Sequence, residues 1–261
     1  MTHAPAHLAL GDGMMMPQLG LGLWRTADAD APQVVRTAIE AGYRLIDTAA
    51  VYGNERGVGQ AMREAAPGSA LFVTTKLWTD DHGYDQTLRA FDASLRRLGL
   101  ADVALYLIHW PAPERDLYVD SWRALIRLKA EGRACSIGVS NFAAEHLRRL
   151  VAETGVAPVV NQVELHPRLQ QRALRSVHAG LGIRTQSWSP LDRGRLLRDP
   201  TVMRIAAHHG KTAAQVIVRW HVEHGLIVIP KSGNAERIRE NIDVFDFQLA
   251  PSELAALDQL E

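Results

Sequence analysis

The stretch GYRLIDTAAVYGNERGVG, residues 42–59, decides how this chain is interpreted. Its first part, Tyr43–Ile46, predicts a short buried strand with Asp47 at its end. Tyr52 follows across a run of small residues, and a helix is expected to begin after Asn54, a residue type that suits an N-cap. A carboxylate and a phenol are thereby expected at the mouth of one strand-to-helix turn, where catalytic groups gather in repeated strand–helix folds.

Short apolar runs alternate with segments of helical period along the rest of the chain. The runs are Leu19–Leu23, Tyr43–Ile46, Leu71–Thr75, Val103–Ile108, Cys135–Val139, Val159–Val163, Arg184–Trp188 and Leu226–Ile229. Most are nearly continuous in apolar residues, which is typical of parallel strands covered on both faces. Helical segments between them include Pro32–Ala41, Tyr84–Leu98, Ser121–Ala130, Ala143–Ala152, Arg172–Leu181, Thr201–His209, Thr212–His224 and Ala235–Val244. The alternation predicts an α/β fold, a (β/α)8 TIM barrel.

The two ends of the chain add one element each. Leu8–Leu19 predicts a small hairpin that turns near Asp12, because an Asp-Gly pair between apolar residues is a strong hairpin signal. Ser252–Leu260 predicts an extra C-terminal helix. Since no linker, low-complexity tract or shift of composition divides the sequence, we expect a single domain over residues 1–261.

Composition excludes several classes of partner. The chain carries 29 basic and 29 acidic residues, whereas a nucleic-acid or membrane-surface partner would require a basic excess or patch. Met1–Gly13 lacks the pattern of a secretory signal, and no apolar stretch approaches the ~20 residues of a membrane helix. We therefore expect a cytoplasmic protein. The single cysteine, Cys135, lies in a predicted strand and is expected in the core.

Five further motifs follow residues 42–59 in order: TTKLW at 74–78, LIHWP at 107–111, IGVSN at 137–141, NQVELHP at 161–167 and IPKS at 229–232. Together they resemble the aldo-keto reductases, NAD(P)H-dependent carbonyl reductases on a TIM barrel. The sequences of these motifs are most similar to those of the bacterial branch that includes 2,5-diketo-D-gluconate reductases. The resemblance spans Leu19 to Leu260 and implies NADPH as cofactor, a small carbonyl substrate, a monomer, and a hairpin that closes the bottom of the barrel.

Carbonyl reduction requires a hydride donor and a proton donor. Tyrosine, with a pKa near ~10, is a weak acid at neutral pH; a nearby ammonium lowers that pKa, and a paired carboxylate holds the ammonium in place. Tyr52, Lys76 and Asp47 supply these groups, and His109 ends the following strand. Taken singly, each of these four residues could have a purely structural role, such as a helix cap or a solvated charge. The resemblance implies that Tyr52 is the general acid, Lys76 tunes it, Asp47 anchors Lys76, and His109 polarises the carbonyl.

The segment at 227–237 predicts a strand, a turn and the start of a helix, whose terminal amides favour a phosphate. Lys231, Ser232 and Arg237 add positive charge and a hydroxyl. The residues alone fit an ordinary solvated loop equally well. The resemblance implies that these three side chains hold the 2′-phosphate of NADPH, and that Glu240 and Asn241 contact adenine.

The nicotinamide half of the cofactor is expected at other strand ends. Ser140, Asn141 and Gln162 are short polar side chains where apolar runs stop, and the resemblance implies that they bind the carboxamide. It also implies that Trp188 stacks on the ring. The remaining cofactor contacts implied by the resemblance are Gly22, Leu23, Asp47, Ser189 and Leu191.

The expected pyrophosphate loop departs from the family at Asp192, where a glycine is frequent. A carboxylate there is unfavourable unless it turns outward or pairs with Arg193 or Arg195. Trp24, Trp78 and Trp110 follow three strands and, with Tyr52 and His109, match positions that line an apolar substrate pocket.

Metal binding is not expected. The pairs His208–His209 and His221–His224 lack the spacing of a metalloprotease motif and a third nearby ligand. Two alternatives to a reductase stay open at this point. One is an NADPH-binding redox-sensing subunit with slow turnover, and the other is a metal-dependent TIM-barrel hydrolase that uses His109, His166 and an Asp.

Overall fold

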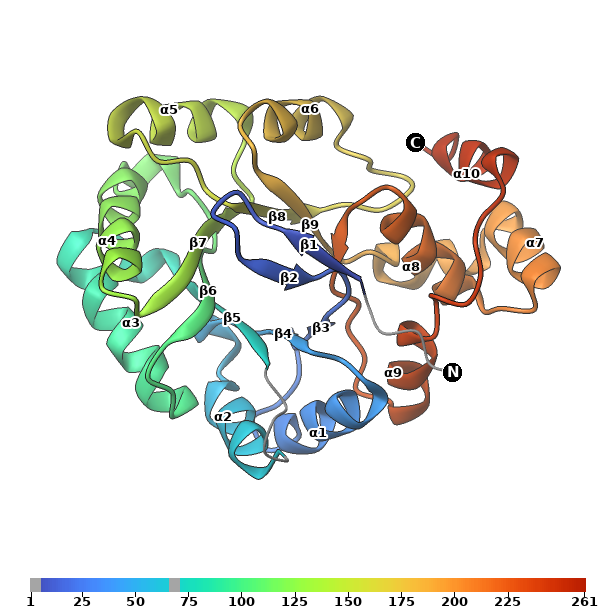
Figure 1. The fold of residues 1–261 in the computed structure, drawn as a ribbon, viewed down its shortest axis with the longest axis horizontal. Helices are drawn as coiled ribbons and strands as arrows, with labels where there is room; N and C mark the ends of the chain where they lie inside the picture. Colours follow the sequence, from blue (N-terminus) through green and yellow to red (C-terminus); the bar gives the residue numbers. More distant parts are fainter. Residues whose placement is uncertain (1–5, 66–70) are drawn as a thin grey trace.

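A computed structural model describes residues 6–65 and 71–261. Within these residues, eight parallel strands form one sheet. They are β3 (Leu21–Gly22), β4 (Leu45–Asp47), β5 (Phe72–Leu77), β6 (Val103–Ile108), β7 (Ala134–Ser140), β8 (Val160–Glu164), β9 (Arg184–Trp188) and β10 (Ile227–Val228). Parallel bridges from Leu19 to Val228 and from Gly22 to Lys231 join the first strand to the last. The sheet therefore closes on itself, and the predicted (β/α)8 barrel is confirmed (Figure 1).

Helices surround the barrel on its outside (Figure 1). They are α1 (Ala31–Ala41), α2 (Glu55–Glu64), α3 (Tyr84–Leu98), α4 (Tyr118–Ala130), α5 (Ala144–Thr154), α6 (Arg172–Gly180), α7 (Pro200–His209), α8 (Ala213–Glu223), α9 (Ala235–Ile242) and α10 (Pro251–Asp258). Helix α1 illustrates why the sequence folds this way: Val34, Val35 and Ala38 recur at helical spacing and are buried. The helix ends at Gly42, whose φ of 104° is a left-handed conformation that glycine adopts without strain.

Most residues of the barrel strands are buried, as their apolar runs predict. Every residue of β5 is buried, including Lys76, and the apolar residues of β6 are at most partly exposed. Strand β4 begins at Leu45, two residues later than expected, and ends at Asp47 as expected. Because all strands run in parallel, the residues at their carboxyl ends meet at one mouth of the barrel.

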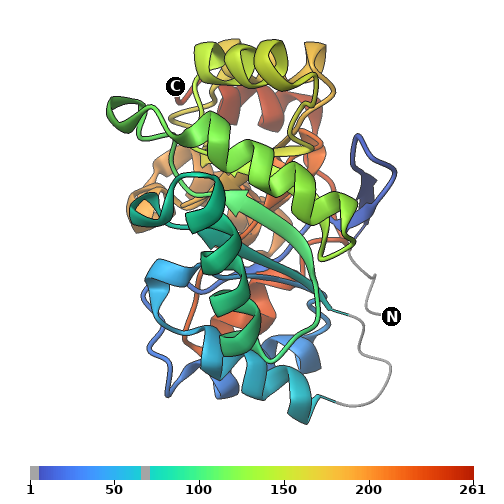
Figure 2. The same ribbon diagram turned by 90° about the vertical axis from the view of Figure 1, so that its left-hand side faces the viewer.

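The predicted hairpin lies across the opposite opening. Strands β1 (His7–Ala9) and β2 (Met15–Pro17) pair antiparallel and lie over one end of the barrel (Figures 1 and 2). Leu10 and Met16 are buried in the apolar cluster that also contains Leu45 and Leu105 from the barrel strands. The hairpin thus covers the end of the barrel opposite the carboxyl ends of the strands.

The extra C-terminal helix is also confirmed. Helix α10 packs beside α7 (Figure 1), and Leu257 joins the apolar cluster that contains Val202 and Ile205 of α7. The indole nitrogen of Trp220 donates a hydrogen bond to Asp258 at 2.8 Å. Among the described helices, none is both long and apolar enough to cross a membrane.

One core prediction is wrong. Cys135 lies in β7, but it is exposed, whereas its neighbours Ala134 and Ser136 are buried. Side chains alternate between the two faces of a strand, so Cys135 faces the opposite way from its two buried neighbours. The expectation that no signal peptide is present rests partly on residues 1–5, which lie outside the described residues.

Candidate active site

A buried ion pair between Asp47 and Lys76 occupies the centre of the barrel mouth. Asp47 ends β4 and Lys76 lies near the end of the adjacent strand β5. The Lys76 ammonium donates to Asp47 Oδ1 at 2.5 Å and to the Thr48 carbonyl at 2.9 Å. Burial would lower the pKa of Lys76, but the opposing groups Asp47 and Tyr52 outweigh it and raise that pKa. The ammonium therefore stays charged, as its expected role requires.

Tyr52 closes a short 3-10 turn, Ala50–Tyr52, directly after β4. Its hydroxyl lies 3.5 Å from Lys76 Nζ, and the ammonium lies 5.0 Å from the centre of the phenol ring. The Lys76 ammonium lowers the pKa of Tyr52, as expected, but it does not set the net direction of the shift. Burial raises the pKa of Tyr52 by more than the attraction of Lys76 lowers it. The phenol is thus held in its protonated form, the form that a proton donor needs.

His109 follows β6 and lies beside Tyr52. The two rings meet edge to face with centroids 5.6 Å apart, and Trp78 contacts His109 in the same way at 5.2 Å. Burial, together with repulsion from the Lys76 ammonium, lowers the pKa of His109 to about 3. The imidazole is therefore neutral at physiological pH and offers one N–H as a hydrogen-bond donor.

Gln162 connects the ion pair to the next strands. Its side-chain amide donates to Asp47 Oδ2 at 2.7 Å and to Gln186 Oε1 at 2.9 Å. It lies within β8, two residues before the strand ends, rather than at the end as expected. Lys76 and Gln162 each take one oxygen of Asp47, so the carboxylate is fixed from both sides. Gln186 was not expected from the sequence, because it lies among other polar residues of β9 and belongs to no recognisable motif.

A second chain of hydrogen bonds joins the other expected nicotinamide contacts. Asn141, with a left-handed φ of 62°, donates to the His109 carbonyl and to Ser140 Oγ, both at 3.0 Å. Trp188 donates from its indole nitrogen to Asn141 Oδ1 at 2.9 Å, which fixes the plane of the indole ring. Ser140 donates to the Gln162 carbonyl at 2.8 Å. The structure thus brings these four residues together at one side of the mouth.

The loop after β9 pairs the Asp192 carboxylate with basic side chains of the protein. Its carboxylate is buried and lies 2.9 Å from Arg195, 3.6 Å from His166 and 3.9 Å from Arg168. Arg193 instead points toward Glu164 at 3.8 Å. The negative charge of Asp192 is therefore paired with Arg195, one of the two partners that would make a carboxylate compatible with a pyrophosphate site here.

That loop is also held in unusual backbone geometry. Ser189, Asp192 and Arg193 have φ values of 49°, 48° and 52°, in the left-handed region that non-glycine residues rarely adopt. Ser189 and Leu191 are both half-buried at its start. Such conformations persist only where the surroundings enforce them, and they gather at binding sites.

The expected phosphate segment follows β10. Gly22 aligns with Asp47 on one side and forms a bridge with Lys231 on the other, so this segment begins at the catalytic end of the barrel. The Leu23 amide donates to the Asp47 carbonyl at 3.0 Å. A side chain at Gly22 would place its Cβ 3.0 Å from the Ile229 carbonyl oxygen, which explains the glycine there.

The turn before helix α9 and the helix itself carry the other members of this segment. Lys231 and Arg237 are exposed, and within the described part of the chain neither side chain forms an ion pair. Ser232 is buried, and its hydroxyl accepts a hydrogen bond from the Asn234 amide at 3.1 Å. Asn234 caps α9 by accepting from the Arg237 amide at 3.0 Å. Glu240 is half-buried and Asn241 buried along the same helix.

The three expected pocket tryptophans lie at strand ends. Trp24 and Trp110 are 46% and 42% exposed, which is unusual for such large apolar side chains, and Trp78 is half-buried against His109. Arg25 stacks on Trp24 with its guanidinium 4.3 Å from the ring centre. Exposed indoles at the mouth give it apolar walls.

Two residues behind the site have roles that the sequence did not reveal. Asn54 occupies the N-cap position of α2, as expected, but its side chain makes no capping bond. It is fully buried and donates to the carbonyls of Leu23 and Thr26 at 3.0 Å each. Glu55, also buried, accepts from Thr75 and Arg97 at 2.6 Å each. These long-range bonds fix the turn that carries Tyr52.

One expectation about metal ligands is also wrong. His208 and His209 do have a third potential ligand, Glu253, which is distant in sequence but adjacent in space. Among the described residues, this is the one group of three or more potential ligands close enough to share an ion, and neither His109 nor His166 belongs to it.

Comparison with known proteins agrees with this architecture. A model of the aldo/keto reductase family matches residues 9–261. The chain is 54% identical over 255 residues to an aldo-keto reductase of Mycobacterium sp. (strain JLS), covering 97% of this chain and 92% of the relative. It is 48% identical over 260 residues to methylglyoxal reductase DkgA of Escherichia coli (strain K12), covering 98% and 94%.

A solved structure extends the comparison to three dimensions. The crystal structure of a Gox0644 mutant in complex with NADPH superposes with a TM-score of 0.96 at 50% identity, covering 99% of this chain and 94% of that one. The match thus includes the barrel, the hairpin and the C-terminal helix. By family model, sequence and structure alike, the chain belongs to the aldo/keto reductase family.

Proposed function

We propose that this chain reduces small aldehydes and ketones to alcohols with NADPH, and that Tyr52 donates the proton. The observation that carries the proposal is the arrangement of Tyr52 Oη 3.5 Å from a fully buried ammonium, Lys76, which is itself bound to Asp47. Family membership supports the reaction class, and a similar structure holds NADPH.

The residues present suit each part of the reaction. The nicotinamide, when bound, supplies the hydride to the carbonyl carbon. The Tyr52 O–H bond breaks as its proton passes to the carbonyl oxygen, and the resulting phenolate is stabilised by the Lys76 ammonium. Asp47 keeps Lys76 charged and in place. His109, neutral because its pKa is about 3, donates an N–H to the carbonyl oxygen.

The cofactor fits the charges of the site. Lys231 and Arg237 are exposed cations without ion-pair partners among the described residues, and they would hold the 2′-phosphate. Asp192 is neutralised by Arg195, so it does not oppose the pyrophosphate. Trp188, with its ring plane fixed by Asn141, would stack on the nicotinamide, and Ser140 and Gln162 would line the carboxamide site.

The two alternatives are less well supported. A hydrolase that uses His109 and His166 would need them to share a metal, yet neither belongs to the ligand cluster among the described residues. A slow NADPH-binding sensor would not require Tyr52, Lys76 and Asp47 to be arranged for proton transfer. Its rate of turnover distinguishes it from a reductase. Because a relative is named methylglyoxal reductase, we take a small α-oxoaldehyde as the first substrate to try. We also infer a monomeric, cytoplasmic protein.

The test compares the natural chain with Tyr52→Phe. NADPH oxidation is followed with methylglyoxal and with an aromatic aldehyde, and NADPH binding is measured separately by quenching of tryptophan fluorescence. The proposal expects turnover in the natural chain and a ~10²–10⁴-fold loss of kcat in the variant, with binding retained. Binding without turnover in the natural chain would favour the sensor, and absence of NADPH binding would overturn the cofactor assignment.

A further inference from the structure

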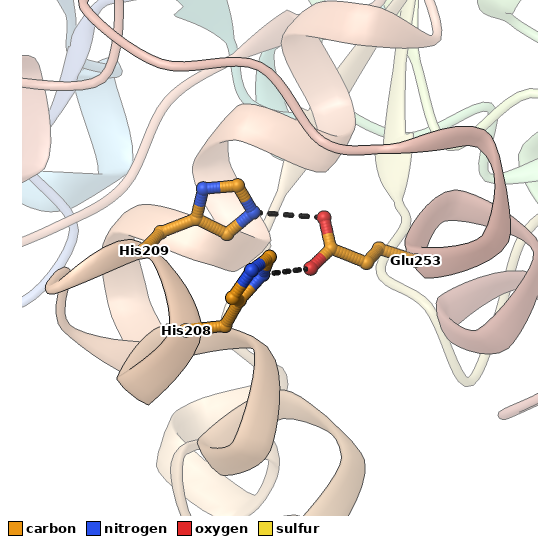
Figure 3. A group of neighbouring side chains, drawn as sticks. All are labelled: His208, His209 and Glu253. Atoms are coloured by element: carbon orange, nitrogen blue, oxygen red, sulfur yellow. Dashed lines mark hydrogen bonds and ion pairs between the residues drawn. The ribbon is translucent and has the colours of Figure 1, made fainter.

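Three side chains outside the active site converge at the junction of α7 and α10. His208 and His209 are the last two residues of α7, and Glu253 lies in the first turn of α10. His208 Nδ1 lies 2.8 Å from Glu253 Oε1, and His209 Nε2 lies 2.8 Å from Oε2 (Figure 3). The two imidazoles therefore contact different oxygens of the same carboxylate.

These groups have the chemistry of a zinc site. Imidazole nitrogens and a carboxylate oxygen bind Zn²⁺ at ~2.0–2.2 Å, and a set of two His and one Glu recurs in zinc proteins with a fourth position left to water. The three ligand atoms lie within 4.8 Å of one another. We propose that His208, His209 and Glu253 bind a zinc ion that joins α7 to α10.

The site needs only a small rearrangement. Ligands of a tetrahedral zinc lie roughly 3.4 Å apart when its bonds are ~2.1 Å long, so a ring nitrogen must move slightly away from the Glu253 oxygen that it contacts at 2.8 Å. His208 can make this movement because its side chain is 71% exposed. Zinc binds the neutral tautomer whose ligating nitrogen carries no proton, so in each ring the single proton must lie on the other nitrogen, Nε2 of His208 and Nδ1 of His209. The exposed side of His208 leaves a path for the ion and its water.

The remaining ligands are held by their surroundings. The Glu253 side chain is only 9% exposed, and its Oε2 also accepts from the Ala250 amide at 2.8 Å. His209 packs against Phe247 with ring centroids 5.2 Å apart. Such supporting contacts orient metal ligands and raise affinity. Two of the three ligands are thus packed in place, and the third, His208, is the exposed one.

The test uses untagged protein in a Cys135→Ser background, because the exposed thiol is itself a zinc ligand. Zinc binding is measured by equilibrium dialysis with elemental analysis, and by the rise of the melting temperature with zinc. We expect one ion per chain, and an affinity at least ~10-fold lower in His208→Ala, His209→Ala and Glu253→Gln. Reductase activity serves as a check that each variant is folded.

His224→Ala is the matched control. His224 pairs with Asp258 at 3.0 Å, also against α10, but no second histidine among the described residues shares that carboxylate. Zinc affinity should be unchanged in this variant. If Glu253→Gln does not fold, His208→Ala still decides the test. The His208 side chain is mostly solvent-exposed, so its removal should leave the fold intact. The proposal is overturned if no stoichiometric zinc binds, or if binding is indifferent to all three ligand substitutions.

Discussion

Lys76 and Lys231 are the same residue type at the catalytic end of one barrel, yet their environments are opposite. Lys76 is fully buried and surrounded by the oxygens of Asp47, Thr48 and Tyr52. Lys231 is exposed and forms no ion pair with any described residue. The first is a charge committed to partners inside the protein, and the second is a charge left available for something outside it.

The two environments suit different tasks: Lys76 is suited to the chemical step, and Lys231 to recognition of the cofactor. A buried charge acts in a medium of low dielectric, so it is strong, specific, and costly to disturb. An exposed charge is screened by salt and contributes modestly to any one contact. We therefore expect substitutions near Lys76 to cost activity and stability, whereas substitutions near Lys231 should alter the choice of cofactor only.

The largest effect on stability is expected from Asp47→Asn. Removing one partner of a buried ion pair leaves the other charge uncompensated, so the free energy of unfolding should fall by ~3–5 kcal/mol. The exposed pair Arg36–Glu64, with side chains 46% and 41% exposed, provides the control. Glu64→Gln should cost ~0–1 kcal/mol in the same urea titration. Equal losses in the two variants would show that burial does not distinguish these pairs.

The next effect is a loss of stability in acid from buried neutral histidines. Burial, with repulsion from Arg175, lowers the pKa of His178 to about 4, and the pKa of His109 is about 3. Hydrogen bonds support neutral His178, because Asn161 lies 2.9 Å from one ring nitrogen and Thr185 2.8 Å from the other. In the unfolded chain both histidines take up protons below about pH 6.5.

The sign follows from proton linkage. Below pH 6.5 the unfolded state binds more protons than the folded state, so stability falls as the pH is lowered toward 4. Each histidine contributes a slope of at most ~1.4 kcal/mol per pH unit. Urea unfolding between pH 7.5 and 4.5 should show this slope, and His178→Gln should reduce it. A pH-independent free energy of unfolding across this range would contradict the assignment.

The smallest effect is expected at the exposed cations. Lys231→Met should raise the KM for NADPH by roughly tenfold, the equivalent of one lost charge-assisted hydrogen bond, and leave the KM for NADH unchanged. Arg237→Met should act in the same direction, and both effects should shrink at high salt. Equal changes for NADPH and NADH would mean that these residues do not contact the 2′-phosphate.

The sequence predicted most of the fold because local patterns determine it. Continuous apolar runs and helical spacing identified the strands and helices, and each strand end then placed Asp47, Lys76 and His109 at one mouth. The errors arose where contacts between distant segments decide the outcome. Asn54 bonds to carbonyls of another loop instead of capping its helix, and Glu253 meets His209 from 44 residues away. The pKa of Tyr52 likewise depends on burial, which no local motif encodes.

The most direct measurement of the central claim is a double-mutant cycle on kcat with Tyr52→Phe, Lys76→Met and the double variant. If Tyr52 donates the proton and Lys76 acts through it, removing the phenol makes the ammonium irrelevant to proton transfer. We predict that the double variant is no slower than the slower single variant. If the two losses in kcat multiply instead, Lys76 acts independently of Tyr52, and the account of the proton donor is wrong.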